Sequence, residues 1–528
     1  MSDALAQFTL NDQHDAARGF PAPGITLLCF LKEDCPTCQL TLPVLECVHA
    51  ELGDSANIWA IGQDPDGNAK LLAEHGLTMP LLDDSELKVS FDYDIEIVPT
   101  VVLADAEARE LTRFEGFDRS DWKALVQRLS ELTGNASPVI DWDQYPSTRP
   151  GCGSKSVEPG VRERLEAEAS GSPLRARRID IAEGDDVSEF LFDQGLTDGL
   201  PVVAPTPERV LKMLAGTRRD PQEEVAVVPP NMAPVTVEKV AINAVMAGCK
   251  PEFLPVILTA LEAVCTDEFN IHGVMATTMG ASPVMIINGP IRERLGMNMR
   301  LGALGQGNRA NATMGRALRL ILRNLGGARP GGTERSTLGN PMKFTMCFPE
   351  WEERSPWEPY HAEHGFAPED STVTVIAMVG GPSLIVDQTS RTAAQLAGSI
   401  GLTLEGVSHP RAHGTGDTLL VLAPEHVDTL SRDQWSKDDI RDRIQEVTSR
   451  PVSELLADEV SGVGFPKRLL GDNPSNEQLA RKVPKFRSKE NIHIVVAGAE
   501  AGKFSAIYQG WASGPIGSMP VTRKIEEA

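Results

Sequence analysis

The chain has 528 residues with a formal net charge of −24 at pH 7, and 41% of its residues are hydrophobic. That length indicates two or three domains, each able to bury a core. The acidic balance argues against nucleic acid and anionic membrane surfaces as partners, because both are negatively charged.

Targeting signals and cysteine usage favour a cytoplasmic protein. No stretch is long and apolar enough to span a bilayer, and the residues MSDALAQFTLND lack the basic and apolar regions of a secretory signal. Eight cysteines in so long a chain do not indicate a disulfide framework. We therefore expect reduced thiols in the cytoplasm and no membrane partner.

The motif Cys35-Pro36-Thr37-Cys38 stands between a predicted strand at residues 25–31 and a helix predicted to start near Pro36. At a helix N-terminus, the dipole and the free backbone N–H groups stabilise a thiolate at Cys35, usually the more exposed sulfur. Cys38, one turn later, can attack a mixed disulfide that Cys35 forms. The pattern predicts a redox-active Cys35–Cys38 disulfide, and no other cofactor is firmly implied.

Two more predicted strands and a helix complete a first domain. Residues 57–62 are apolar, residues 101–103 form an apolar run just after Pro99, and residues 121–132 have helical spacing. A proline just before a strand, about 60 residues after a C-x-x-C motif, resembles the thioredoxin fold. The resemblance covers residues 1–135. It implies a cis Pro99 that lies against both cysteines and shapes a groove for the extended chain of a substrate.

Two further features bear on the chemistry of the motif. Lys32-Glu33-Asp34 precede Cys35, and this acidic approach is expected to raise the pKa of its thiol. The alternative use of a C-x-x-C pair is half of a zinc site. That use requires a second pair of ligands at suitable spacing, and the chain has no second C-x-x-C.

Residues 136–176 are rich in proline, serine, glycine and charge, and we interpret them as a linker. Cys152 lies in this linker between two glycines, shortly before Lys155. The glycines are expected to leave the thiol mobile and exposed, and Lys155 is expected to favour its thiolate. Cys152 could then shuttle oxidising equivalents; the alternative is a spare surface cysteine.

Residues 177–528 are expected to form a larger α/β or α+β substrate domain, because long helical patterns alternate with short apolar strands. A change in pattern near residue 370 is a candidate sub-domain boundary. The chain is thus predicted to be α/β, with a thioredoxin-like domain followed by the larger domain. The main helices are predicted over 236–249, 252–264 and 312–325, and the main strands over 284–288, 372–379, 418–422 and 492–497.

A glycine-rich turn at residues 302–311 runs directly into a predicted helix. Such a turn leaves backbone N–H groups free to hold an anion, and Asn308, Arg309 and Asn311 add side-chain donors. The turn is a poor dinucleotide fingerprint, since no acidic residue stands at the expected place. We predict that it binds an anionic group such as a carboxylate; the alternative is a glycine loop needed for close packing.

Residues 347–358 combine a cysteine, four carboxylates and two indoles. Trp351 and Trp357 are candidate walls of a binding pocket. Glu350 is a candidate general acid, provided that a neighbouring indole desolvates it. The alternative is a solvated acidic loop anchored by its tryptophans.

Two cysteines of the large domain are candidate reactive thiols. Cys347 opens the segment just described. Cys249 ends a predicted helix beside Lys250, whose charge is expected to lower the pKa of a nearby thiol, and core packing is the alternative. His361 and His364 are the candidate ligands if a metal is bound, but no metal is firmly indicated.

A second resemblance covers residues 190–528. The stretches DGLPVV, TVEKVAINAVMAGCKPEFLPV, GNRANATMGRALRLILRNLGG and SPWEP resemble a poorly characterised bacterial family. That family is associated with small proteins that carry a selenocysteine (or Cys)-Gly-Ser-Cys motif and are similar to glycine and betaine reductase subunits. The resemblance implies a thiol- or selenol-linked reductive role, and Cys152-Gly153-Ser154 echoes the partner motif.

These observations favour a thiol–disulfide-linked oxidoreductase that acts on a small, anionic organic substrate. Cys35 attacks an oxidised or electrophilic sulfur, Cys38 resolves the product, and an external dithiol system of the thioredoxin type reduces the pair again. Cys152, Cys249 and Cys347 are the candidate internal partners of Cys35. Two alternatives stay open: a lyase that cleaves a carbon–sulfur or organometal bond, and a redox sensor or scaffold. The sequence also leaves the oligomeric state open.

Overall fold

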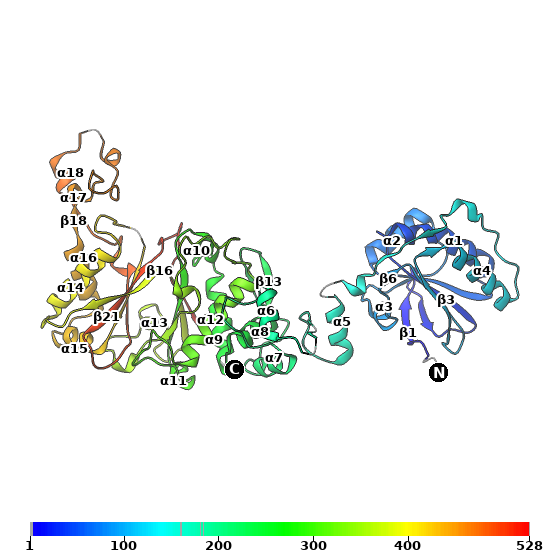
Figure 1. Ribbon diagram of the computed structural model, residues 1–528, viewed down its shortest axis with the longest axis horizontal. Coiled ribbons are helices and arrows are strands. Elements are labelled where there is room, and N and C mark those ends of the chain that lie inside the picture. Colours follow the sequence, from blue (N-terminus) through cyan, green and yellow to red (C-terminus); the bar gives the residue numbers. More distant parts are fainter. Residues whose placement is uncertain are drawn as a thin grey trace. The chain divides into compact units, whose positions relative to one another are not determined.

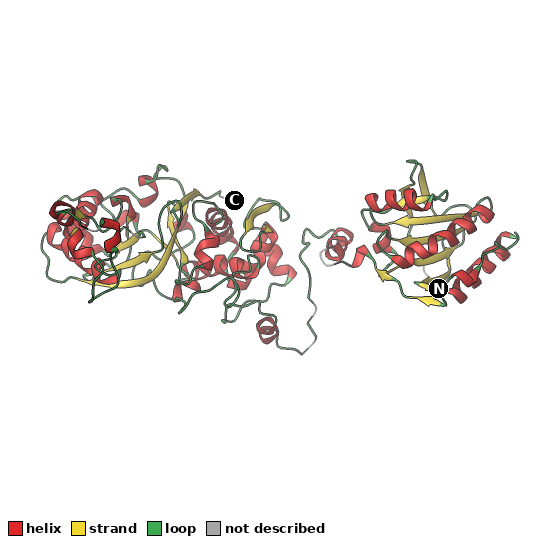
Figure 2. Cartoon of the chain, turned by 90° about the horizontal axis from the view of Figure 1, so that it is seen from above, coloured by secondary structure: helices red, strands yellow, loops and turns green. Residues whose placement is uncertain are grey.

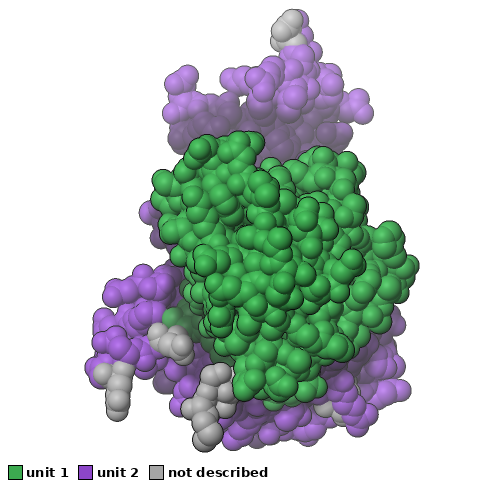
Figure 3. Space-filling view, turned by 90° about the vertical axis from the view of Figure 1, so that its right-hand side faces the viewer, with its two compact units in different colours: residues 1–180 green, residues 181–528 purple. Residues whose placement is uncertain are grey.

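The computed structural model describes residues 4–158, 161–179, 181–182, 184–414, 416–471 and 473–526. The chain forms two compact units, residues 1–180 and residues 181–528 (Figure 3). Each unit has its own central sheet and its own buried apolar core. Within the described ranges, none of the helices has the length and apolar character needed to cross a membrane.

Unit 1 (residues 1–180, blue to cyan in Figure 1) is built on a five-stranded sheet. The strand order is β5-β4-β3-β7-β8. β3 is parallel to β4 and β4 to β5, whereas β7 is antiparallel to both β3 and β8. This order is that of the thioredoxin-like fold, and the predicted α/β class of this part is confirmed. The strands are β3 (Ile25–Leu31), β4 (Ala56–Gly62), β5 (Leu81–Asp83), β7 (Thr100–Ala104) and β8 (Glu110–Glu115).

The helices of unit 1 bury one apolar face each against this sheet. In α1 the buried face includes Leu42, Leu45 and Val48, and in α4 it includes Trp122 and Leu129. A short hairpin of β1 (Phe8–Asn11) and β2 (Ala17–Phe20) lies beside them. The described helices are α1 (Pro36–Leu52), α2 (Pro65–His75), α3 (Lys88–Asp92), α4 (Arg119–Thr133) and α5 (Val161–Ser170).

Residues 148–154, here called the β10–β11 segment, fold onto unit 1, although the sequence predicts a linker there. β10 (Thr148–Arg149) pairs with β9 (Phe117–Asp118), and β11 (Cys152–Gly153) pairs with β6 (Ile97–Val98). Both pairings are antiparallel. The segment therefore satisfies backbone groups beside the C-x-x-C motif, which the compositional pattern of a linker does not reveal.

Unit 2 (residues 181–528) contains a seven-stranded mixed sheet with the order β15-β14-β16-β21-β17-β20, in which β22 also pairs with β16. Figure 2 shows its helices in red around the strands in yellow. The unit is a mixed α/β region with a curled sheet, as the fold class predicts. The strands are β14 (Ser282–Asn288), β15 (Cys347–Pro349), β16 (Thr372–Val386), β17 (Thr418–Leu422), β20 (Ile492–Val496), β21 (Phe504–Gly510) and β22 (Val521–Lys524).

The long strand β16 holds this sheet together. Its first half pairs with β14 and β22 and its second half with β21, with register shifts near Gly381. Gly381 has a φ of 125°, and a Cβ there would lie 2.8 Å from the carbonyl oxygen of Ile507, so glycine is required at the bend. β16 begins at the predicted sub-domain boundary near residue 370, yet it lies inside a single sheet.

Helices and minor strands surround the sheet of unit 2. The helices are α6 (Val187–Asp193), α7 (Pro207–Leu214), α8 (Val237–Ala247), α9 (Leu254–Val264), α10 (Ile271–Ala276), α11 (Ile291–Arg294), α12 (Arg309–Asn324), α13 (Tyr360–Glu363), α14 (Ala393–Val407), α15 (Pro424–Arg432), α16 (Lys437–Thr448), α17 (Val452–Leu455) and α18 (Asn476–Ala480). The minor strands are β12 (Glu224–Val228), β13 (Ala233–Thr236), β18 (Arg450–Pro451) and β19 (Lys482–Val483).

Candidate active site

Cys35 is the N-cap residue of α1 and lies in the short turn that follows β3. The backbone N–H of Cys38 donates a hydrogen bond to the Cys35 sulfur over 3.3 Å. Pro36 occupies the first turn, where its missing N–H costs nothing and its fixed φ favours the helix. The Cys35 sulfur also lies 3.5 Å from the carbonyl oxygen of Val98. The short connection from strand to helix therefore aims the first thiol at the end of the sheet.

The two thiols of the motif differ strongly in acidity. Hydrogen bonds from the side chain of Cys38, then from Cys152 and the backbone N–H groups of Cys38 and Thr37, outweigh the effect of burial and lower the pKa of Cys35 to about 5. Burial raises the pKa of Cys38 far above the ordinary range. At neutral pH the site thus holds one thiolate, at Cys35, and one proton-bearing thiol one turn away.

The expected effect of the acidic residues before Cys35 is wrong. Lys32 pairs with Asp34 over 3.3 Å, and Glu33 lies 3.7 Å from the ammonium group of Lys155. Both carboxylates face cations, and the pKa of Cys35 is lowered rather than raised. The side chains of Cys35 and Cys38 are both fully buried, so the expected difference in exposure between the two sulfurs is not seen.

The Val98–Pro99 peptide bond is cis, as the resemblance to thioredoxins implies. The carbonyl oxygen of Pro99 accepts a hydrogen bond of 2.7 Å from the N–H of Gly116, and Thr100 begins β7. Pro99 therefore connects the short strand β6 to the central sheet. Its position brings the carbonyl group of Val98 to the sulfur of Cys35.

Cys152 lies beside Cys35, opposite Val98 in the β6–β11 pair. The thiol is partly buried, so the prediction of a mobile, exposed cysteine is wrong. Lys155 does not favour its thiolate, because the ammonium group pairs with Asp64 over 2.8 Å. The hydrogen bond to Cys35 instead raises the pKa of Cys152. Cys35, Cys38 and Cys152 thus form one cluster, in which Cys152 is a neutral donor to the thiolate.

In unit 2, Cys249 and Arg309 line the same cavity, of about 470 Å³. Cys249 follows the left-handed cap Gly248 at the end of α8, and its thiol donates to the carbonyl oxygen of Thr313 over 3.4 Å. Burial raises the pKa of Cys249 to about 12, so the expected lowering by Lys250 does not prevail. Charged residues dominate the rim of the cavity: Arg209, Lys212, Lys250, Glu252 and Arg309.

The predicted anion-binding turn contributes only Arg309 to this cavity. Asn308 is the N-cap of α12, and its side chain donates to the carbonyl oxygen of Gly296 over 2.8 Å. Asn311 is buried, and its amide group bonds to the backbone of Asn298. Both asparagines shape the loop, because their side-chain atoms are used within the protein. Arg309 donates to the carbonyl oxygen of Gly248 over 2.8 Å, which places it at the cavity rim.

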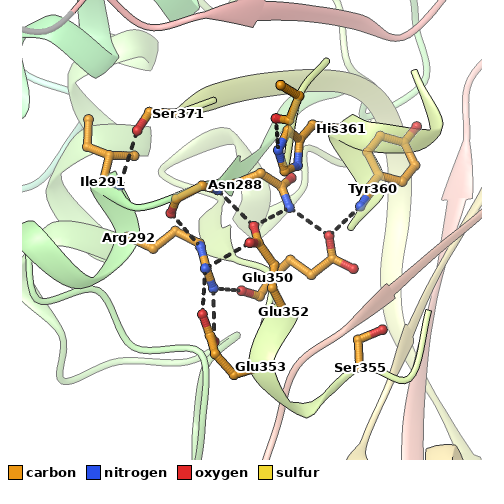
Figure 4. A network of polar contacts seen from close by, with 12 residues as sticks. Asn288, Ile291, Arg292, Glu350, Glu352, Glu353, Ser355, Tyr360, His361 and Ser371 are labelled. Carbon is orange, nitrogen blue, oxygen red and sulfur yellow. Dashed lines mark hydrogen bonds and ion pairs between the residues drawn. The ribbon is translucent and has the colours of Figure 1, made fainter. Parts of the chain in front are cut away.

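Glu350 lies in a buried polar network rather than in a cavity (Figure 4). Its carboxylate accepts hydrogen bonds of 2.7 Å from the side chain of Asn288 and from the N–H of Tyr360. Nearby, Arg292 binds Glu352 and the carbonyl oxygen of Glu350. Burial raises the pKa of Glu350, as expected of a general acid, but the full burial of its side chain leaves no route for a substrate. Sequence spacing gives no signal for this partnership with Arg292.

The other candidates of residues 347–358 lie apart from one another. Cys347 is buried on β15 opposite Met285 of β14, and burial raises the pKa of its thiol well above the ordinary range. The Trp351 ring is buried, with the guanidinium group of Arg300 at 4.8 Å from its centroid. Trp357 lines a separate cavity of about 530 Å³ with His364 and His493. No described cavity gathers Cys347, Glu350 and both tryptophans.

The two candidate metal-ligating histidines make backbone contacts. His361 is buried with its Nε2 3.1 Å from the carbonyl oxygen of Ala367, and the Nδ1 of His364 is 2.8 Å from that of Tyr360. Over the described ranges, no group of three or more His, Cys, Asp or Glu side chains is arranged to hold a metal ion.

Three solved structures that resemble this chain each cover about a quarter of it. No protein-family model and no curated protein matches the chain. A candidate thiol:disulfide interchange protein DsbE from Chlorobium tepidum is 22% identical, matches 25% of this chain and 96% of its own, and has a TM-score of 0.24. StoA from Bacillus subtilis is 22% identical over 22% of this chain and 96% of its own, with a TM-score of 0.21.

A secreted disulfide oxidoreductase of Mycobacterium tuberculosis, homologous to E. coli DsbE, is 19% identical over 24% of this chain and 96% of its own, with a TM-score of 0.22. At these identities the likeness concerns the fold of unit 1. The resemblance of residues 190–528 to a bacterial family with glycine reductase-like partners gains no support from these comparisons.

The lowered pKa of Cys35 predicts a titration that is visible without any substrate. The thiolate absorbs in the ultraviolet, and the difference in absorbance between the reduced protein and its Cys35→Ser variant isolates this one group. The difference is expected to be full above pH 7 and to fall as the pH drops, with a midpoint near the pKa of about 5. A midpoint of about 8.5, as for an ordinary thiol, would contradict the proposed stabilisation.

Proposed function

We propose that the protein is a thiol–disulfide oxidoreductase whose reacting pair is Cys35 and Cys38. The observation that carries the proposal is the placement of Cys35 as N-cap of α1, with a hydrogen bond from the Cys38 N–H and a pKa of about 5. The thioredoxin-like fold of unit 1 suggests the same redox chemistry. A thiolate at this position is both ionised at neutral pH and able to attack sulfur.

The reaction proceeds by two exchanges of a sulfur–sulfur bond. The thiolate of Cys35 attacks one sulfur of a substrate disulfide, a mixed disulfide forms, and the other substrate sulfur leaves with the electron pair and takes a proton. Cys38 then loses its proton and attacks the sulfur of Cys35, so the substrate departs as a dithiol and Cys35–Cys38 becomes a disulfide. An external dithiol of the thioredoxin type returns the pair to its reduced form.

The high pKa of Cys38 gives this sequence its order. A buried thiol with a raised pKa does not compete for the incoming disulfide, so the first attack belongs to Cys35. Once Cys35 is in a mixed disulfide, its negative charge is gone, and the departing substrate sulfur can accept the Cys38 proton. Burial is the main cause of the raised pKa of Cys38, and the further contribution of the Cys35 thiolate is removed as the reaction advances.

We further propose that unit 2 binds a small anionic molecule in the cavity of Cys249 and Arg309. Four cationic side chains and one carboxylate line it, and positive charge at a concave surface favours anions. The Cys249 thiol is neutral at pH 7, so in this state it acts as a wall of the cavity rather than as a nucleophile. The structure does not support the lyase alternative, because the carboxylate of its candidate general acid, Glu350, is fully buried and hydrogen-bonded within the protein.

Cys35→Ser is expected to lower the rate of dithiothreitol-driven insulin reduction by about 10²-fold or more, because the nucleophile is lost. Cys38→Ser is expected to lower the rate as well, because it removes the thiol that closes the Cys35–Cys38 disulfide. Cys47→Ser is the matched control, since Cys47 lies on the same helix α1 and outside the cluster. Reduction that survives Cys35→Ser would refute the assignment, and a signalling role without turnover would give no reduction in any variant, native protein included.

Malonate serves as the probe of the cavity in unit 2. Lys212→Gln and Lys250→Gln are each expected to weaken its binding to the full chain about tenfold, because each removes one charge-assisted contact. Arg432→Gln removes an exposed cation on α15, away from the cavity, and is expected to leave binding unchanged. Binding measured by calorimetry that is equally weak in all three variants would mean that the cavity does not select anions.

A further inference from the structure

The β10–β11 segment lies where a thioredoxin-like protein needs an open groove. Cys152 and Gly153 form antiparallel pairs with Val98 and Ile97, immediately before the cis peptide of Pro99. The N–H of Ser154 continues the ladder and donates to the carbonyl oxygen of Glu96 over 2.8 Å. An extended chain that adds a strand to a free backbone edge is a general mode of peptide recognition. Here the extended chain is the protein's own.

Side chains on both flanks fix the register of this strand. On one flank, the hydroxyl of Thr37 donates to the carbonyl oxygen of Pro150 over 2.7 Å. On the other, the buried hydroxyl of Ser154 accepts a hydrogen bond of 2.7 Å from Gln63, and the N–H of Lys155 donates to the same Gln63 side chain over 3.0 Å. These contacts lie on both sides of Cys152 in the sequence. They therefore fix the backbone of Cys152 opposite Val98, beside Cys35.

The two glycines beside Cys152 differ in a way that tests this arrangement. A Cβ at position 151 would lie 2.4 Å from the Cγ2 of Ile97 and 2.7 Å from the carbonyl oxygen of Val98. A Cβ at position 153 would meet nothing within 4 Å. Glycine is therefore required at 151 for the strand to approach β6, whereas position 153 tolerates alanine.

Cys152 and Cys35 are joined by a hydrogen bond between their sulfur atoms, and the Cys35 side chain is fully buried. We infer that Cys152 is the internal disulfide partner of Cys35, presented by a strand that occupies the groove as a tethered substrate. The inference rests on the proposed function of Cys35. It assigns a third exchanging thiol to the site and makes the β10–β11 segment the element that must leave before another substrate can enter.

The proposed step is a thiol–disulfide exchange among the sulfurs of Cys35, Cys38 and Cys152. When Cys35 is in a mixed disulfide, for example with glutathione, Cys152 loses its proton and attacks the sulfur of Cys35. A Cys35–Cys152 bond forms, the bond to glutathione breaks, and glutathione leaves with the electron pair and a proton. Cys38 can then attack Cys35 in turn, which forms Cys35–Cys38 and returns Cys152 to a thiol, with no net change in oxidation state.

The three-cysteine arrangement makes access to the site depend on its redox state. A Cys35–Cys152 bond would fasten the strand across the groove, whereas a Cys35–Cys38 bond would leave the strand held by its hydrogen bonds alone. Since hydrogen bonds that can be exchanged for bonds to water contribute little net stability, the second state can open to a substrate disulfide. Lys155 adds an ion pair with Asp64 that is partly exposed and does not prevent opening.

The test is a trap in the full chain. Cys38→Ser is treated with glutathione disulfide, and disulfide-linked peptides are mapped by mass spectrometry. The expected product is a Cys35–Cys152 bond without glutathione, with release about a hundredfold faster than in the Cys38→Ser/Cys152→Ser double variant, because a tethered thiol acts at millimolar or higher effective concentration. A stable glutathione adduct on Cys35 overturns the inference and leaves the proposed function intact. No adduct and no bond at Cys35 overturns both.

A matched glycine pair shows whether the strand presents Cys152. In the Cys38→Ser background, Gly151→Ala is expected to slow release of glutathione about tenfold or more, because its Cβ clashes with β6. Gly153→Ala is expected to release glutathione as fast as the parent. Equal rates in both variants would mean that Cys152 reaches Cys35 from a free chain and that no strand occupies the groove.

Discussion

The hydrogen bond from the Cys38 N–H to the sulfur of Cys35 is the interaction on which the site depends. It exists because Cys35, in the short turn between β3 and α1, caps the helix, and its sulfur meets the unpaired N–H groups of the first turn. The N–H groups of the first helical turn stabilise a negatively charged thiolate, but they do not stabilise an uncharged disulfide. The reduced pair is therefore stabilised relative to the oxidised pair, which makes the Cys35–Cys38 disulfide more oxidising.

The same end of the sheet leaves β6 with backbone groups that require partners. The β10–β11 segment supplies these partners by pairing with β6. The same pairing places the sulfur of Cys152 beside that of Cys35. Unit 2 holds its cysteines differently. Burial keeps Cys249 and Cys347 protonated, and cationic residues gather around Cys249 instead. The acidic thiol lies in unit 1, and the candidate anion site lies in unit 2.

Much of the fold could be predicted from local pattern. The apolar run that became β3, the helix start at Pro36 and the proline before β7 are signals carried by neighbouring residues. The role of residues 148–154 could not be predicted, because their composition is that of a linker. Cys152 and Ser154 have partners about 50 to 90 residues away in the chain, Val98 and Gln63. Glu350 likewise fits a catalytic pattern, but its burial with Asn288 depends on packing of the sheet. Short-range spacing points to Cys35, the proposed nucleophile, and gives no signal for the strand that brings Cys152 beside it.

Amide hydrogen exchange in the reduced full chain tests the central claim most directly. The account places the N–H of Ser154 on Glu96 and the N–H of Lys155 on Gln63, beside the Cys35 thiolate. Both amides should exchange far more slowly than those of an unstructured chain, because exchange requires the β10–β11 segment to separate from β6. Exchange of residues 150–155 at the rate of an unstructured chain would contradict the account, since the groove would then be open and Cys152 free.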